Sequence, residues 1–162
     1  MKFFKPNKMM KKLKLFYVVI LASLLSISCE SIKTAAFDQY SYQKATEIKV
    51  ESNHLIENAT NPYGNYETEV EELLSDLDKI IEYEKNKPYN DVSLQLWQIL
   101  SDDERNLLAG FLKRWKEKGQ MSEVFVSEAK SQVMEAIDLI IQYEANKNKQ
   151  SKEQLISLIN NY

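Results

Sequence analysis

Residues 70–84, VEELLSDLDKIIEYE, decide the fold. Their apolar side chains recur at spacings of three and four residues, which is the period of an α-helix with one face in a core. The positions on that face are Val70, Leu73, Leu74, Leu77, Ile80, Ile81 and Glu84. Four glutamates lie within residues 67–72, where they suit the positive end of a helix dipole. We predict that the helix ends near Asn86, before Pro88.

The same period continues on both sides of this helix. Upstream it predicts a helix over residues 37–59. The segment NPYGN at residues 61–65 then predicts a turn, because proline fixes φ and glycine and asparagine tolerate left-handed conformations. Downstream the pattern predicts a short helix over residues 92–100, VSLQLWQIL.

Two further helix starts are marked by serine. Ser101 and Glu104 match the S-x-x-E capping box, in which each side chain accepts a hydrogen bond from the other residue's backbone N–H. We therefore predict a helix from Ser101 to Gly119, with basic residues in its last turn. Ser122 begins the next apolar stripe, and a polar break at residues 146–150 separates that stripe from a short terminal helix.

The connections between these helices are short, so consecutive helices should be antiparallel neighbours. A lone amphipathic helix is marginal in water, and each apolar stripe must therefore face the others. The sequence predicts an all-α fold, an antiparallel helical bundle of four main helices plus one or two short helices. This bundle forms a single domain at residues 37–162.

One segment occurs twice within the bundle. Residues 78–87, DKIIEYEKNK, and residues 138–147, DLIIQYEANK, agree at seven of ten positions. The repeat indicates either a duplicated helical hairpin or two helices that end alike, each with an isoleucine pair in the core and a polar finish. We favour the second interpretation, because a true repeat array needs about three copies.

Residues 1–28 differ from the rest of the chain in charge. They contain six of the 21 basic residues and no acidic residue, so the remaining 15 basic and 24 acidic residues give the body a net charge of −9. A basic segment at residues 1–14 is followed by the apolar segment LFYVVILASLLSIS at residues 15–28, the order of a signal peptide. Fourteen helical residues cover about 21 Å, less than a hydrocarbon core of about 30 Å. We therefore predict that residues 1–28 are the signal peptide of an exported precursor and not a membrane-spanning anchor.

The apolar segment ends at Ser26-Ile27-Ser28-Cys29, which resembles the lipid-attachment box of bacterial lipoproteins. The box differs from the usual one, because Leu25 lies four residues before the cysteine. In this departure it resembles the lipid-attachment boxes of Bacteroidota lipoproteins. The resemblance implies cleavage before Cys29, acylation of Cys29, a lipidated tether at residues 29–36, and a location in the cell envelope. We expect the protein in the outer membrane and not in the inner one. Whether it faces the periplasm or the cell surface stays open.

The sequence contains little that indicates chemistry. A single cysteine excludes a disulfide framework within the chain and a Cys-based zinc site. Glu51 and His54 have the Glu-x-x-His spacing of di-iron bundles, but the second copy that such sites need cannot exist with one histidine. The adjacent carboxylates Asp102/Asp103 and Glu71/Glu72 point apart on a helix. We predict no catalytic residue, no metal ligand and no cofactor-binding residue, and we interpret His54 as a partly exposed polar residue.

Two surfaces allow more than one interpretation. The basic run at residues 113–118, KRWKEK, fits lipid head-group contact, but complementing the helix dipole explains it equally well. Seven tyrosines of the body suit either a partner surface or the margin of a core. They are Tyr40, Tyr42, Tyr63, Tyr66, Tyr83, Tyr89 and Tyr143.

Three classes of function stay open. The first, which we favour, is a lipid-anchored, non-catalytic binding or structural module of the cell envelope. The second is a periplasmic immunity-type inhibitor of a toxin or hydrolase, because small acidic inhibitors are steered onto basic targets. The third is an enzyme, for which no phosphate loop, nucleophile elbow or His-containing triad can be drawn. Expected partners are the membrane, through lipid on Cys29, and an envelope protein. The acidic body argues against nucleic acid, and no small-molecule substrate is indicated.

Overall fold

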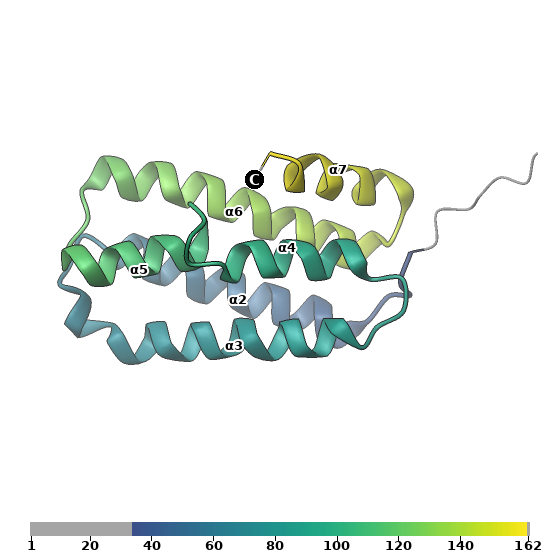
Figure 1. Cartoon of the computed structure of the whole chain (residues 1–162), viewed down its shortest axis with the longest axis horizontal. Coiled ribbons are helices and arrows are strands. Elements are labelled where there is room, and N and C mark those ends of the chain that lie inside the picture. The colour runs from purple at the N-terminus through teal and green to yellow at the C-terminus, as the bar shows by residue number, and fades with distance from the viewer. Residues whose placement is uncertain (1–33, 162) are drawn as a thin grey trace, which may run out of the picture. The chain divides into compact units, whose positions relative to one another are not determined.

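The computed structural model describes residues 34–161, and every regular element in this range is helical (Figure 1). The elements are α2 (Gln39–Asn58), the 3₁₀ turn η1 (Tyr63–Asn65), α3 (Glu67–Lys85), α4 (Asp91–Ser101), α5 (Leu108–Lys118), α6 (Glu123–Asn146) and α7 (Lys149–Ile159). Figure 1 shows α4 and α5 in line, together as long as their neighbours. The predicted all-α antiparallel bundle is confirmed, with α4 and α5 sharing one of its four long positions.

Most helix ends follow from local sequence. Asp38 caps α2 by accepting a hydrogen bond from the backbone N–H of Tyr40 at 2.9 Å. Ser122 caps α6, as predicted, by accepting from the N–H of Phe125 at 3.3 Å. Both caps satisfy backbone donors that a helix leaves without a partner. Helix α3 begins at Glu67, as predicted from the acidic first turn.

The predicted capping box at Ser101 is wrong. Ser101 is the last residue of α4, and its hydroxyl donates to the carbonyl of Gln98 at 3.1 Å. The carboxylate of Asp102 accepts instead from the N–H of Glu104 at 3.0 Å, which forms a turn. The next helix therefore starts seven residues later than predicted, at Leu108.

Packing explains why the segment between α4 and α5 is not helical. The side chain of Leu107 is completely buried, which fixes the end of this segment in the core. The backbone carbonyl of Arg105 lies against Gly110, at a place where a Cβ atom on that residue would overlap it. This close approach of the backbone requires a residue without a Cβ atom at position 110, so the observed loop depends on a glycine inside α5.

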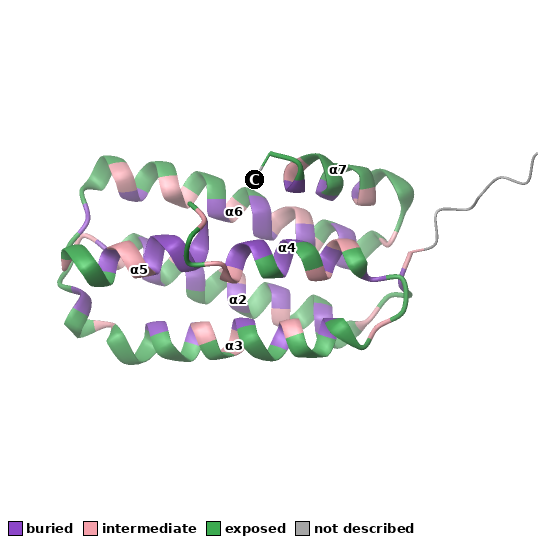
Figure 2. Cartoon of the chain, in the orientation of Figure 1, coloured by how far each residue is buried: buried purple, intermediate pink, exposed green. Residues whose placement is uncertain are grey.

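The core runs the length of the bundle, and the buried faces of the helices turn toward one another (Figure 2). At one end the indole of Trp115 is completely buried and donates to the carbonyl of Asn61 at 3.0 Å. The ring of Tyr63 meets it edge-on, with 5.4 Å between centroids. This aromatic contact fastens the α2–α3 connection to α5 and closes what we call the far end of the bundle.

The opposite end is where the described chain joins the bundle, and we call it the entry end. Here α2 begins, α3 ends, α4 begins and α6 ends. The hydroxyl of Thr34 donates to the backbone carbonyl of Lys147 at 2.9 Å, and Ala35 is buried. The first described residues are therefore held against the end of α6.

Candidate functional site

The predicted lipid-attachment residue Cys29 and the predicted signal peptide at residues 1–28 lie outside the described residues. Of the predicted tether, residues 34–36 are described, and they are not helical. Because these residues lie at the entry end, an anchor on Cys29 would be joined to the bundle at that end. Residues at the entry end would therefore be the part of the bundle nearest to such an anchor.

The two copies of the repeated segment meet at the entry end. Glu84 and Glu144 are equivalent residues of the repeat, and their exposures are 1% and 0%. Each is followed three residues later by a lysine with which it pairs. Nζ of Lys87 lies 3.2 Å from Oε2 of Glu84, and Nζ of Lys147 lies 2.6 Å from Oε2 of Glu144. We call these four residues the Glu–Lys cluster.

Two further pairs of shared residues have equivalent environments, whereas the shared tyrosines differ, because Tyr143 is buried and Tyr83 is exposed. The side-chain amides of Asn86 and Asn146 donate to the carbonyls four residues earlier, at 2.9 and 2.7 Å. Ile80 and Ile140 are both completely buried. The repeat therefore meets the same need twice: a core contact, a buried carboxylate and a polar helix end. Both interpretations of the repeat predict equivalent contacts of this kind.

Hydrogen bonds connect the Glu–Lys cluster to two further helices. Glu84 accepts from the hydroxyl of Ser41 on α2 and from the side-chain amide of Asn90 before α4. Glu144 accepts from the hydroxyl of Ser93 on α4 at 2.7 Å. Nζ of Lys87 also lies 3.8 Å from Oε2 of Glu144, so it links the two copies. The cluster thus joins α2, α3, α4 and α6 at one point.

Burial shifts the pKa values of two side chains in this region, Lys147 and Tyr143. Desolvation lowers the pKa of Lys147, although the hydrogen bond to Glu144 acts in the opposite direction. Burial, and then the charge of Glu144, raise the pKa of Tyr143 to about 12. Sequence reasoning found the repeat but assigned no role to its glutamates. The available signal was Glu84, a charged residue on the apolar face of the predicted helix, since buried charges are paired.

The structure divides the seven tyrosines into buried and exposed residues, a distinction that the sequence alone did not allow. Tyr63 and Tyr143 are buried, and Tyr66 is half-buried beside Trp115 at 5.5 Å between ring centroids. These three belong to the core or its margin. The exposed tyrosines are Tyr40, Tyr42, Tyr83 and Tyr89. All four lie at the entry end, on the start of α2, the end of α3 and the turn before α4.

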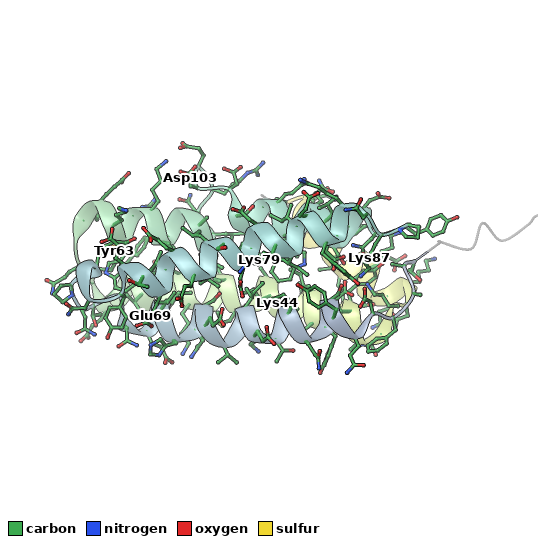
Figure 3. All side chains as sticks on the ribbon, turned by 90° about the horizontal axis from the view of Figure 1, so that it is seen from below. Lys44, Tyr63, Glu69, Lys79, Lys87 and Asp103 are labelled. Atoms are coloured by element: carbon green, nitrogen blue, oxygen red, sulfur yellow. The ribbon has the colours of Figure 1, made fainter. Side chains whose placement is uncertain are left out.

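The basic run at residues 113–118 lies at the far end (Figure 3 shows Tyr63 and Lys87 at opposite ends). Lys113 pairs with Glu104 at 2.6 Å and Lys116 pairs with Glu67 at 3.2 Å. The aromatic residue of the run is the buried Trp115. Two charges of the run thus join α5 to neighbouring segments, which argues against lipid contact as their main role, and these ion pairs do not test the helix-dipole interpretation.

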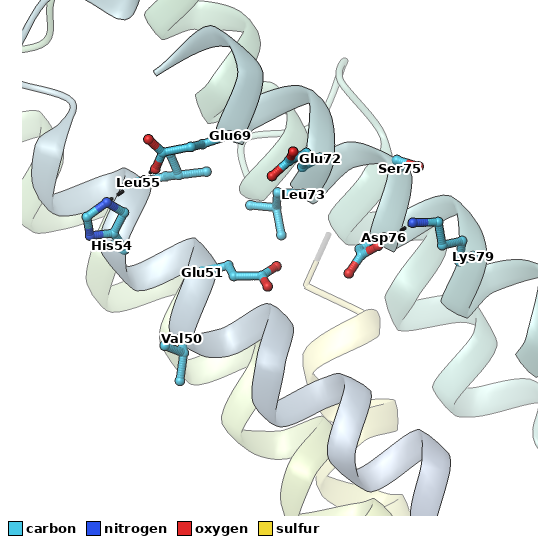
Figure 4. A pocket seen from close by; sticks show the side chains of 10 residues that line it. All are labelled: Val50, Glu51, His54, Leu55, Glu69, Glu72, Leu73, Ser75, Asp76 and Lys79. Atoms are coloured by element: carbon cyan, nitrogen blue, oxygen red, sulfur yellow. Dashed lines mark hydrogen bonds and ion pairs between the residues drawn. The ribbon is translucent and has the colours of Figure 1, made fainter. Parts of the chain in front are cut away.

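An acidic groove of about 620 Å³ lies between α2 and α3 (Figure 4). Its carboxylates come from both helices and are Glu51, Glu69, Glu72 and Asp76. Within it Asp76 binds Lys79 at 2.7 Å. Burial, and then the charge of Asp76, raise the pKa of Glu51. The groove therefore presents negative charge beside apolar side chains and suits a basic partner surface.

His54 also lines this groove, one turn of α2 from Glu51. Its side chain is 57% exposed, in agreement with its interpretation as a partly exposed polar residue, and Nε2 lies 3.3 Å from Oε2 of Glu69. Within residues 34–161 no cluster of three or more histidine, cysteine or acidic side chains is arranged to bind a metal ion. Glu51 and His54, which have the Glu-x-x-His spacing, thus both line this groove.

Comparisons of the chain with models of protein families, with curated proteins and with solved structures found no match. Within the described part of the chain, no helix combines the length and the apolar character needed to span a bilayer.

Proposed function

We propose that the protein is a lipid-anchored component of a bacterial cell envelope, held in the membrane by acyl chains on Cys29. The observation that carries this proposal is the order of a basic segment, a 14-residue apolar segment and a cysteine, in a chain whose remaining residues have a net charge of −9. A single acyl chain gives marginal binding, and two or more give a stable anchor. The helical bundle would then be the part that the anchor carries.

We infer that the bundle acts as a non-catalytic binding or structural module. The most buried carboxylates, Glu84 and Glu144, are engaged by serine, asparagine and lysine side chains that join helices. Separating buried charge pairs of this kind is costly, so they favour the arrangement of helices in which they form. The acidic groove between α2 and α3 is the surface that we assign to a protein partner.

The acidic groove supports a second candidate, a periplasmic immunity-type inhibitor of a toxin or hydrolase. A groove with four carboxylates would steer a basic partner by electrostatic attraction. Co-expression with a toxin encoded beside this gene tests the candidate. Protection that is lost in E69K/E72K and kept in a control, E82K outside the groove, supports it. Equal protection by both variants, or none by the wild type, argues against it.

The anchor is tested by labelling cells with palmitate. Cys29→Ala should abolish labelling of the protein and release it from the membrane fraction. Ser31→Ala is the matched control, because it changes a small residue outside the box, and it should keep both properties. Unchanged labelling and retention of the Cys29→Ala variant would overturn the proposal.

A further inference from the structure

In the described part of the chain, the strongly exposed aromatic side chains lie at one end of the bundle. Among residues 34–161 the large aromatic side chains with high exposure are Phe37 (59%), Tyr40 (41%), Tyr42 (38%), Tyr83 (39%) and Tyr89 (52%). All lie at the entry end, and we call them the aromatic collar. The other exposed large apolar residues are single aliphatic side chains on α2, α6 and α7, and they form no comparable group.

The rings of the collar are ordered by contacts with one another. Phe37 lies 6.4 Å from Tyr42 and Tyr40 lies 4.5 Å from Tyr83, measured between ring centroids. The hydroxyl of Tyr83 donates to Asp38 at 2.7 Å. Four of the five collar side chains are thus preformed, and binding to them requires little further ordering.

Several charges around the collar are paired with an opposite charge. Asp38 lies 3.4 Å from Nζ of Lys87, and Glu82 pairs with Lys85 at 2.9 Å. Glu84 and Glu144 belong to the Glu–Lys cluster. The acidic groove between α2 and α3 holds a share of the body's negative charge away from this end. Because anionic lipid repels acidic proteins, the entry end is the part of this body suited to approach a bilayer.

We propose that the aromatic collar lies in the head-group layer of the membrane that holds the acyl chains. This inference rests on the proposed anchor at Cys29. Thr34 follows Cys29 by five residues, which span at most about 18 Å when fully extended. Tyrosine suits this layer because its ring is apolar and its hydroxyl is polar. The far end, with Trp115, then faces away from the bilayer, and the groove stays accessible from the side.

The test uses the full processed protein, reconstituted through its own anchor into vesicles of phosphatidylethanolamine and phosphatidylglycerol. Tyr89→Cys provides a thiol for an environment-sensitive fluorophore, since lipidation occupies Cys29. Val124→Cys is the matched control, because Val124 is 69% exposed at the far end of the bundle. A spin-labelled lipid with its label near the head group should quench most of the emission at residue 89 and leave residue 124 unquenched. Tyr42→Cys, also in the collar, should behave like Tyr89→Cys.

The outcomes separate this inference from the proposed anchor. Protein that does not float with the vesicles has no anchor, and both proposals are then wrong. Protein that floats while the probes at residues 42 and 89 stay unquenched keeps its anchor and overturns the collar inference. Blue-shifted emission that the spin-labelled lipid does not quench would mean that a protein surface, such as a second copy, covers the collar, and this too contradicts lipid contact.

Discussion

Nζ of Lys147 lies 2.6 Å from Oε2 of Glu144, and both side chains are almost fully buried, with exposures of 7% and 1%. The two residues are three positions apart at the end of α6. Removing two charges from water is costly, and a buried pair is seldom a net source of stability. Its role here is positional, since the pair holds the end of α6 against α4 through Ser93.

Removal of one partner should expose that cost. Glu144→Ala leaves the ammonium of Lys147 buried without its carboxylate, and we expect a loss of about 3–5 kcal/mol in the free energy of unfolding. Glu82→Ala removes a solvent-exposed ion pair and should change it by less than about 0.5 kcal/mol. Urea unfolding followed by circular dichroism measures both. Equal, small effects would show that the pair is not part of a tightly packed network.

The loop between α4 and α5 gives a prediction about glycine. In Gly110→Ala the new Cβ would overlap the backbone carbonyl of Arg105, so we expect destabilisation by about 1–3 kcal/mol from overpacking. A Cβ atom added to Gly64 would instead point into open space, and Gly64→Ala should stabilise by up to about 1 kcal/mol by restricting the unfolded chain. Thermal unfolding of the two variants should therefore shift in opposite directions. A neutral Gly110→Ala would contradict the packing of this loop.

The aromatic collar contains a titration that can be measured. The hydrogen bond to Asp38, together with burial, raises the pKa of Tyr83 to about 12. Asp38→Asn removes the negative charge, so the pKa of Tyr83 should fall toward its ordinary value of 10.0. Tyrosine labelled with ¹³C at Cζ reports this in an NMR titration, with Tyr83→Phe to assign the signal. An unchanged titration in Asp38→Asn would mean that the two residues are not in contact.

Acid should weaken the contact between α2 and α3. The pKa of Asp76 is lowered by its hydrogen bond to Lys79 and, against desolvation, by Lys44. A lowered pKa contributes stability above the ordinary value of 3.8, and this stability is lost as pH falls through the folded value. Asp76→Asn should therefore be less stable than wild type at neutral pH and lose less on acidification. Melting temperatures across the acid range test this, with Glu82→Gln as an exposed control. Parallel curves for wild type and Asp76→Asn would contradict it.

The helices could be predicted because their information is local. Glu67 and Ser122 begin helices where the sequence indicates, and the core face of α3 follows from its spacing. The start of α5 was not predicted, because the spacing of residues shows neither the burial of Leu107 nor the close approach of the Arg105 carbonyl to Gly110. Ser101 shows the result: a complete capping motif lies at the end of a helix.

The candidate site was less predictable, for a similar reason. The repeat showed that Glu84 and Glu144 are equivalent, but only the arrangement of α3 and α6 shows that Lys87 lies between them. The tyrosines occupy two environments that the residue type does not distinguish, as the buried Tyr143 and the exposed Tyr89 show. Cys29, in contrast, is predicted from sequence alone and lies outside the described residues.

The most direct test of the central claim is mass spectrometry of the amino-terminal peptide of the protein isolated from the membranes of the cells that make it. We predict a chain that begins at Cys29 and carries acyl chains on that residue. A chain that begins at Met1 with its leader intact, or an unmodified Cys29, would contradict the account.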